Sequence, residues 1–360
     1  MGSKPGWDGL TFGWWTLPAM EATLTYAANA TLQTARPLPG MAKVVGQFIK
    51  KPGKALEAYA TSKKAWRLIG KPTSGAKVLH FARMERRRTF LESNGYVRKS
   101  DAQKGNQRGL ASCLTHCQAI EDEIGELRRR GCQAEIAWLD FEDGYPSTEH
   151  GLMEAAEEFF GIPERERAYW QALDAQGQVE VRFDGEVLWE GLALCGTVQG
   201  GTESVDRFCL AAELPLRASD ARLEPDRVAW QDGENTTIAR RKTRKGLLDD
   251  TTLVCRTERA MDAELKILDE DLRSVNLVLN PVKCVTARLA KGAFQRSKAP
   301  YVVGGVAVPR LEECDTGTTK FLGAVFGIDG KATEGAVLEK LRTQLSRVDA
   351  AEVRGAAKVV

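Results

Sequence analysis

Three aspartates carry the strongest chemical signal in this sequence. Asp249 and Asp250 stand between two apolar, β-prone runs, and Asp140 lies near the end of a third apolar run over 134–141. Neighbouring side chains of a strand point to opposite faces, so two adjacent carboxylates at a tight turn can present one into a site and one beside it. If the strands are neighbours, Asp140 and Asp249 meet at one end of a sheet. This arrangement suits two Mg²⁺ ions about 3.5 to 4 Å apart, as in-line phosphoryl transfer requires.

Basic residues that could bind phosphate groups accompany these acids. A run over 42–51 that ends in Lys51 and a run over 63–69 that contains Arg67 predict a hairpin with basic residues near its turn. Such side chains form charge-assisted hydrogen bonds with phosphate oxygens. Each feature also has an interpretation without a chemical role. Adjacent acids usually form a solvated turn, and a basic hairpin is usually only a charged surface. Their order and context in one chain favour a nucleotide site.

The overall charge of the chain is nearly balanced. Its 360 residues include 51 Lys and Arg against 49 Asp and Glu, a formal net charge of +2. Affinity for nucleic acid must therefore come from local clusters and not from the global field. Two such clusters are an arginine-rich predicted helix over 77–91 and the segment 240–245, although a solvated surface is the alternative for both. The length and the 43% apolar content allow two or three globular domains.

Membrane and secretory signals are missing from the sequence. No apolar run approaches the roughly 18 residues of a membrane span, and the N-terminus lacks a charged start followed by an apolar core. Gly6 stands where N-myristoylation requires Ser or Thr. We therefore expect an intracellular protein with no membrane partner, and leave open whether it is nuclear or cytoplasmic.

The eight cysteines have no CxxC spacing and are interpreted as reduced thiols. Cys113, His116 and Cys117 resemble a set of metal ligands. However, apolar residues recur at helical spacing from Cys113 to Leu127, and no fourth zinc ligand accompanies them. The pattern therefore predicts the buried face of a helix.

The remaining periodicity predicts one α+β layer. The clearest hairpin is 178–191, where apolar residues alternate on both sides of an Asp-Gly turn. A second hairpin is expected over 247–254, a helix over 258–275 and a strand over 277–279. Together with the strand over 134–141, these elements form a single layered unit.

Several short motifs follow one another in a fixed order. They are the basic hairpin, QRG before a helix, DFEDGYP, a glycine-rich turn with glutamine, LDD, LNPVKC and KFLG. This series, from about Ala42 to Phe326, resembles the reverse transcriptase domain of non-LTR (LINE-type) retrotransposons and, less closely, that of group II introns. The specificity of the resemblance lies in the order and spacing of the motifs.

The resemblance assigns catalytic roles to residues at matching positions. Asp140 and Asp249 match metal-binding aspartates, Asp250 completes the aspartate pair, and Lys283 falls on the lysine of the next motif. Asp140 and Asp249 would hold two Mg²⁺ ions, for which Mn²⁺ could substitute, one at the primer 3′-hydroxyl and one at the leaving pyrophosphate. Lys283 is the candidate proton donor to that pyrophosphate, the alternative being an exposed lysine after a strand.

Further positions match nucleotide and primer contacts of the family. Tyr145 lies five residues past Asp140, where a bulky ring against the sugar can exclude a 2′-hydroxyl. The alternative for Tyr145 is a core or loop aromatic. The resemblance places the nucleotide at Lys51, Arg67, Phe141, Tyr145, Gln199 and Gly200, and the primer grip at Phe321, Leu322 and Gly323.

The implied architecture is an α+β right-hand polymerase. We expect a lead-in over 1–42, fingers over 43–132, a palm with a ferredoxin-like antiparallel sheet over 133–312, and a primer grip with the start of an incomplete thumb over 313–360. The implied activity is that of an RNA-directed DNA polymerase, which extends a DNA primer with dNTPs on an RNA template. The chain would then be part of a larger retroelement polyprotein.

Departures from the family's pattern leave an alternative open. Pro146 replaces an aspartate, Glu203 lies where Ser-Pro usually follows the glycine-rich turn, and Leu247 replaces a tyrosine before the aspartate pair. These departures favour a catalytically inactive remnant that at most binds RNA, whereas the intact carboxylates favour an active enzyme. An RNA-templated RNA polymerase shares the palm, but the aromatic Tyr145 argues against it.

Overall fold

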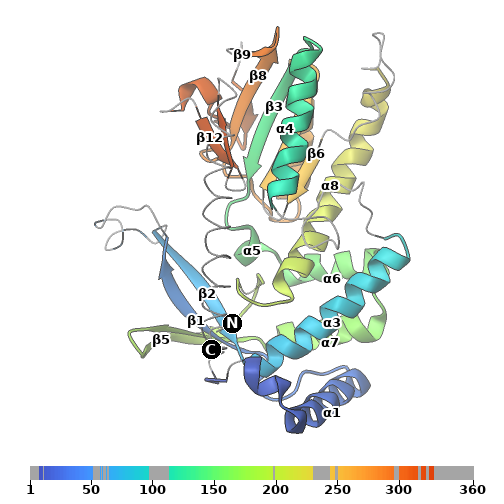
Figure 1. Cartoon of the computed structure of the whole chain (residues 1–360), viewed down its shortest axis with the longest axis vertical. Helices are drawn as coiled ribbons and strands as arrows, with labels where there is room; N and C mark the ends of the chain where they lie inside the picture. Colours follow the sequence, from blue (N-terminus) through green and yellow to red (C-terminus); the bar gives the residue numbers. More distant parts are fainter. Residues whose placement is uncertain are drawn as a thin grey trace, which may run out of the picture. The chain divides into compact units, whose positions relative to one another are not determined.

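Two compact units make up the chain, and each draws on separate stretches of sequence (Figure 1). In the computed structural model the first unit comprises Met1–Arg108, Asp143–Asp220 and Asp271–Val278, and the second comprises Gly109–Glu142, Ala221–Glu270 and Leu279–Val360. The units are interleaved along the sequence, so the assignment of fingers and palm to contiguous ranges stays a prediction. The structure describes residues 8–10, 12–51, 57, 59, 62, 65–96, 113–197, 199–229, 244–247, 250–295, 300–314, 318–321 and 324–327.

A four-stranded sheet organises the first unit. Its strands are β1 (Lys43–Lys50), β2 (Trp66–Pro72), β4 (Gln178–Phe183) and β5 (Glu186–Leu192), in the order β2-β1-β4-β5. The strands β1 and β4 are parallel, and the other neighbours are antiparallel. Both hairpins expected from the sequence therefore form. Asp184 and Gly185 take positive φ angles of 48° and 88°, as a two-residue hairpin turn of the twist-matching type requires.

The N-terminal lead-in contains a helix that packs on the unit. A short 3-10 helix, η1 (Phe12–Thr16), precedes α1 (Pro18–Thr34), which lies beside α3 (Ser74–Ser93) (Figure 1). Leu24 and Ala27 of α1 pack against buried Ala76 and Leu79 of α3. Apolar contacts of this kind order the segment, although its sequence has no clear helical period.

Three further helices complete the first unit's core. They are α6 (His150–Phe159), α7 (Glu164–Ala175) and the beginning of α8 (Ser204–Ala229), preceded by the single turn α5 (Gly144–Ser147). Met153 and Phe160 join Leu210 of α8 in one buried cluster. Met84 of α3 joins Tyr169 of α7 in another, so α3 is held between two apolar clusters.

Buried ion pairs also hold these helices together. Glu157 accepts hydrogen bonds from Arg87, at 2.8 Å, and from Arg207, at 3.1 Å, and Arg207 also reaches both oxygens of Asp174 at 2.8 and 2.7 Å. Arg83 pairs with Glu166 at 2.5 Å. The suggestion that the arginines of this helix form a basic face along nucleic acid is therefore wrong for Arg83 and Arg87, because both are buried and neutralised.

A five-stranded antiparallel sheet organises the second unit. Its strands are β6 (Arg244–Leu247), β7 (Asp250–Cys255), β3 (Ala134–Asp140), β8 (Val285–Ala290) and β9 (Ala293–Gln295), in the order β6-β7-β3-β8-β9. The central strand β3 pairs with β7 on one side and with β8 on the other. This agrees with the expected antiparallel sheet of an α+β layer.

Helix α4 (Cys113–Arg129) lies along this sheet (Figure 1). Its residues Cys117, Ile120 and Ile124 are buried against Ile136 and Trp138 of β3. The stripe is helix core, as its spacing predicts, and Cys117 is buried within it. On the second face of β3, Ala137 and Leu139 are also buried, so this strand is covered on both sides.

The strand expected over 277–279 is wrong. After α9 (Glu258–Arg273) the chain makes a single bridge between Leu279 and Phe141 and then turns, with the N–H groups of Lys283 and Cys284 both donating to the carbonyl of Asn280. Pro281 has no N–H to give to a ladder, which favours this turn. Regular pairing begins at β8, and the apolar leucines at 277 and 279 are buried without forming a strand.

Smaller pieces complete the description of the second unit. They are the hairpin β10 (Val302–Val303) and β11 (Val306–Ala307), the 3-10 helix η3 (Leu311–Glu313), and the hairpin β12 (Thr318–Phe321) and β13 (Ala324–Gly327). Asp249, Leu322, Gly323 and residues 240–243 lie outside the described residues. Among the helices that the structure describes, none has the length and apolar character needed to cross a membrane.

Candidate active site

One edge of the second unit's sheet gathers the acids singled out in the sequence. Asp140, the last residue of β3, is the register partner of Asp250, the first residue of β7. Directly opposed residues of an antiparallel pair point to the same face with their Cβ atoms about 5 Å apart. Leu247 of β6 is also paired with Asp250. Asp249 directly precedes Asp250 in the sequence and lies outside the described residues.

Lys283 contacts the same edge. Its Nζ donates a hydrogen bond to Oδ2 of Asp140 at 2.7 Å, and 60% of its side chain is exposed. The turn that carries it is fixed to the end of β3, because the N–H of Asn280 donates to the carbonyl of Asp140 at 2.8 Å. Lys283 and Asp140 are 143 residues apart in the sequence. Backbone hydrogen bonds between their segments hold the two side chains together.

Cys284, the next residue, is a packed thiol. It is fully buried, and its Sγ lies 3.9 Å from the carbonyl oxygen of Asp140. Burial raises the pKa of the Cys284 thiol to about 12, so the thiol stays protonated at neutral pH and is a poor nucleophile. The chemistry of this edge therefore rests on its carboxylates and Lys283.

The donors at this edge suit a hard divalent cation. Asp140 keeps about a quarter of its side chain exposed, and carboxylate oxygens are the ligands that Mg²⁺ prefers. Within the described ranges, no group of three or more His, Cys, Asp or Glu side chains is gathered as a metal site. Asp140 and Asp250 supply two opposed carboxylates, so the donor chemistry of this edge fits Mg²⁺.

The basic hairpin belongs to the first unit. Lys51 follows β1 directly, and its N–H donates to the carbonyl of Ala65 at 2.9 Å. Arg67 is exposed on β2, opposite Ile49 of β1. Lys50, next to Lys51 in the sequence, holds its ammonium group 5.7 Å from the ring of Trp66. The hairpin thus presents Arg67 freely and engages Lys50 in a cation–π contact.

The glycine-rich turn docks on the same hairpin. The carbonyl of Gln199 accepts a hydrogen bond from the N–H of Gly70 at 2.8 Å. Gly200 has a φ of +119°, and a Cβ there would lie 2.5 Å from the carbonyl oxygen of Gly70. Only glycine fits this position, since the backbone conformation and the space both exclude a side chain. The turn and the strand that carries Arg67 are therefore positioned together.

Two predicted nucleotide contacts have other packing partners. The ring of Tyr145 stacks on Phe208, with ring centroids 4.5 Å apart and planes 24° apart, and remains partly exposed. Phe141 is 3% exposed, so any contact with a nucleotide would come from its backbone. Tyr145 and Phe141 belong to different units, and their roles toward a nucleotide stay predictions.

The departure at Glu203 has a structural counterpart that the sequence analysis missed. Glu203 accepts from Nδ1 of His80 at 3.2 Å, and Nε2 of His80 meets the hydroxyl of Tyr169 at 3.0 Å. Burial acts to raise the pKa of Glu203, but His80, the residue's own backbone N–H and Arg207 together outweigh it and hold that pKa below its ordinary value. The helical spacing of His80, Met84 and Arg87 could have indicated that this face of α3 is buried.

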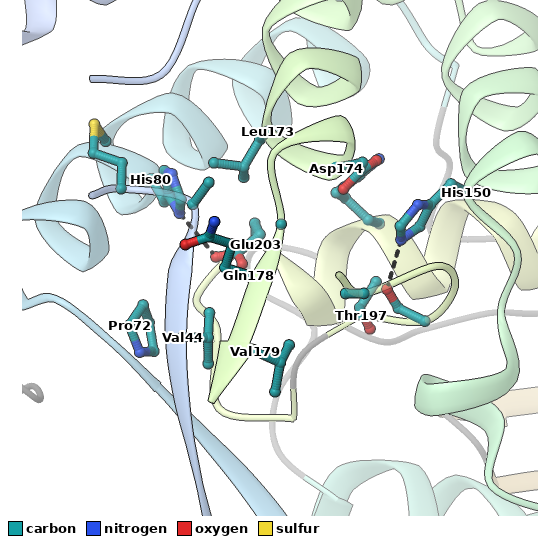
Figure 2. Close-up of a pocket in the computed structure, with 16 residues that line it drawn as sticks. Val44, Pro72, His80, His150, Leu173, Asp174, Gln178, Val179, Thr197 and Glu203 are labelled. Atoms are coloured by element: carbon teal, nitrogen blue, oxygen red, sulfur yellow. Dashed lines mark hydrogen bonds and ion pairs between the residues drawn. The ribbon is translucent and has the colours of Figure 1, made fainter. Parts of the chain in front are cut away.

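Figure 2 shows the small pocket around these groups. Its cavity is about 50 Å³, and its polar lining is largely engaged: His150 contacts the carbonyl of Gly196 at 3.1 Å, and Asp174 pairs with Arg207. A group of titratable side chains that already satisfy one another has a structural role. The sheet edge at Asp140 is therefore the better candidate for catalysis.

Comparisons with known proteins identify the fold. No family model matches the sequence, and no curated protein is similar to it. Among solved structures, the chain is similar to apo telomerase from Candida tropicalis truncated from its C-terminal domain, with a TM-score of 0.50 and 11% identity over 86% of this chain and 59% of that one. It is also similar to telomerase from Candida albicans in complex with a fragment of telomeric RNA, with a TM-score of 0.47 and 12% identity over 81% of this chain and 51% of that one.

The chain has a mixed α/β fold similar to that of the Candida tropicalis telomerase chain. At 11% identity this likeness shows the fold alone, and it agrees with the expected fold in its coarse form. A narrower origin in non-LTR elements or group II introns remains a hypothesis from the motifs. The chain spans 59% of the length of the Candida tropicalis telomerase chain.

Of the expected primer grip, the structure describes the backbone of Phe321. Phe321 of β12 pairs with Ala324 of β13. Leu322 and Gly323 lie outside the described residues, so the primer grip stays a prediction.

The glycine-rich turn generates a test of the fold at the hairpin. Gly200→Ala should lower the free energy of unfolding by roughly 2 kcal/mol or more, because a side chain in such a conformation costs about 1–3 kcal/mol before any clash. Gly151→Ala is the matched control, since a Cβ there meets nothing within 4 Å. Urea unfolding of both variants measures the effect, and equal stability of Gly200→Ala and the parent would contradict the close approach.

Proposed function

We propose that this chain is the RNA-directed DNA polymerase domain of a retroelement, transferring nucleotides from dNTPs to a primer 3′-hydroxyl. The observation that carries the proposal is the register of Asp140 with Asp250, the residue that follows Asp249 in the sequence. A reverse-transcriptase-like fold supports it, because the paired carboxylates stand at the end of the central strands of its antiparallel sheet.

Each residue at this edge has a distinct part in the proposal. Asp140 and Asp249 would hold two Mg²⁺ ions, which polarise the primer hydroxyl and take up charge from the leaving pyrophosphate. Asp250, opposite Asp140, adds negative charge that favours cation binding. Lys283 holds a proton within reach of this edge, and its 2.7 Å contact with Asp140 fixes where that proton sits.

Residues of the first unit would bind the nucleotide. Lys51 and Arg67 neutralise the triphosphate, and the Gln199-Gly200 turn offers backbone that a ligand can approach closely. Tyr145 acts as a steric gate against the 2′-hydroxyl. RNA as template, DNA as primer and a larger polyprotein complete the proposal, which takes the origin in a retroelement from the order of the motifs.

A catalytically inactive remnant is the second candidate. Leu247 of β6 is paired with Asp250 itself, so the aromatic that usually supports a primer end is missing right beside the proposed site. Pro146 also replaces an aspartate in the neighbouring motif. In this candidate the fold persists and the domain at most binds RNA. A primer-extension assay on the purified chain separates the two candidates directly.

Asp249→Asn should abolish that extension. Loss of a metal-binding carboxylate removes several kcal/mol of charge stabilisation, so we expect a fall in rate of about 100-fold or more. Affinity for the primer-template should change little, because the substitution removes no phosphate contact. Asp262→Asn, an exposed position on α9, is the control and should extend normally. Normal extension by Asp249→Asn would refute the assignment.

Lys283→Ala should slow incorporation at saturating dNTP by about 100-fold, as expected for a lost general acid. Primer-template affinity should stay the same. Lys283→Arg keeps the positive charge beside Asp140 but holds its proton too tightly, so it should remain slow and flatten the pH profile. Lys266→Ala, an exposed lysine on α9, serves as the control. If Lys283→Ala keeps the full rate, Lys283 is not the general acid and is only an exposed partner of Asp140.

Tyr145→Val should raise ribonucleotide incorporation relative to deoxyribonucleotide incorporation by about tenfold or more, about 1.4 kcal/mol of discrimination. Tyr145→Phe keeps the ring on Phe208 and should keep the preference. Competition between labelled rNTP and dNTP measures the ratio, and thermal unfolding reports stability. A less stable Tyr145→Val with an unchanged preference would mean that the ring only packs.

A further inference from the structure

A cavity of about 260 Å³ in the first unit is not explained by the proposed polymerase chemistry. It lies between α1, α3 and the start of α7, which are neighbours in Figure 1. A site for a single water needs only about 10–15 Å³. This cavity is therefore large enough for a small organic ligand.

Arginines dominate the polar lining of this cavity. Arg83, Arg86, Arg87 and Arg165 all line it, and Glu166 is the acid among the lining residues. Glu166 is already engaged, because it pairs with Arg83 at 2.5 Å and accepts from the indole of a neighbouring tryptophan at 3.0 Å. Positive charge at the cavity thus exceeds negative charge.

The excess charge lies on the two exposed arginines. Within the part of the chain that the structure describes, neither Arg86 nor Arg165 has a carboxylate partner. Arg165 donates to the carbonyl of Gln33 and keeps its charge uncompensated. Two exposed guanidinium groups at one cavity favour a ligand with at least two negative charges.

Two buried arginines lie behind the exposed pair. Arg83 is 6% exposed and Arg87 is 3% exposed, and both line the cavity. Nη2 of Arg83, and Nε and Nη2 of Arg87, have no hydrogen-bond partner among the described residues, and all three atoms are fully buried. These groups therefore add positive charge behind the cavity wall, and direct contacts to a ligand fall to Arg86 and Arg165.

The start of α7 forms part of the wall. The helix begins at Glu164, and Pro163, its N-cap residue, has no side-chain oxygen to cap the first turn. Pro163 and Arg165 both line the cavity. Glu164 and Glu166 lie in the first turn and offset the positive end of the helix, so the excess positive charge at this wall comes from the arginines.

The rest of the wall is apolar and includes an aromatic ring. Leu32, Phe90 and Ile162 line this part of the cavity. Phe90 is stacked on Tyr96 with ring centroids 5.7 Å apart, which holds the plane of its ring. The ligand should thus combine a dianionic group with a flat or apolar one, a combination that inorganic phosphate alone does not offer.

We propose that this cavity binds a nucleoside 5′-phosphate, with the phosphate at Arg86, Arg165 and the start of α7, and the base against the apolar wall at Phe90. A free nucleotide and the 5′-phosphorylated end of a nucleic-acid strand share this chemistry. The proposal does not depend on polymerase activity, because all the residues that carry it belong to the first unit and none is in the proposed catalytic edge.

The test is calorimetric titration of the full chain with AMP, with adenosine and with inorganic phosphate. EDTA is present throughout, so metal-dependent nucleotide binding does not contribute. AMP should bind at least about tenfold more tightly than either fragment, since both parts of the cavity are then used. Binding of adenosine equal to that of AMP would overturn the proposal, because the arginines would then have no role.

Variants locate the binding. Arg86→Ala combined with Arg165→Ala should weaken AMP binding by about tenfold or more, as expected for lost charge-assisted hydrogen bonds. Arg182→Ala, on β4 and away from the cavity, removes a half-exposed arginine and should leave the affinity unchanged. Thermal unfolding without ligand checks that the double variant is folded. Equal AMP affinity of the double variant and Arg182→Ala would place the nucleotide elsewhere and refute the site.

A short RNA with a 5′-phosphate or a 5′-hydroxyl distinguishes the two sources. A phosphorylated strand that binds more tightly than both AMP and the hydroxyl strand, with the difference lost in the double variant, identifies a strand end. Equal binding of the two strands with AMP binding intact identifies a free nucleotide. If a glutamate-rich peptide binds at Arg86 and Arg165 and AMP does not, the proposal is overturned in favour of an acidic protein partner.

Discussion

The register of β3 between its two neighbours is the constraint on which the candidate site depends. Because side chains alternate along a strand, a slip of one residue would turn Asp140 away from the face that it shares with Asp250. Burial on both faces prevents such a slip. Trp138 packs toward α4 on one face, and Leu139 is buried on the other, so an exchange of sides would force the large indole into a site packed around smaller side chains.

The first unit is held by a different kind of constraint. Glu157 lies between two arginines, from α3 and α8, and each carboxylate oxygen or guanidinium in this network is removed from water. Such pairs contribute little net stability, but removing a single partner leaves a buried charge and costs roughly 3–5 kcal/mol. The network therefore selects one arrangement of these helices. It also accounts for part of the near balance of charge in the sequence.

Local patterns made much of the fold predictable from the sequence. The alternation over 178–191, the helical stripe that ends at Leu127 and the apolar run before Asp140 all form the expected elements, because burial follows their periods. The leucines at 277–279 show the limit, since an apolar run can be buried without joining a ladder. No local sequence pattern indicates that Arg87 pairs with Glu157. The two residues are 70 positions apart, and only tertiary packing brings them together.

The pairing of β3 with β7 and β8 has a consequence for the order of folding. Asp140 and Lys283 are separated by 143 residues, and β3 can complete its ladder only when β8 is present. During synthesis from the N-terminus, β3 and α4 must therefore wait with an unpaired strand edge while Asp143–Asp220 of the first unit emerges. Contacts of this range are slow to form, and an unpaired edge is prone to aggregation. The candidate catalytic edge is thus among the last parts of the described structure to assemble.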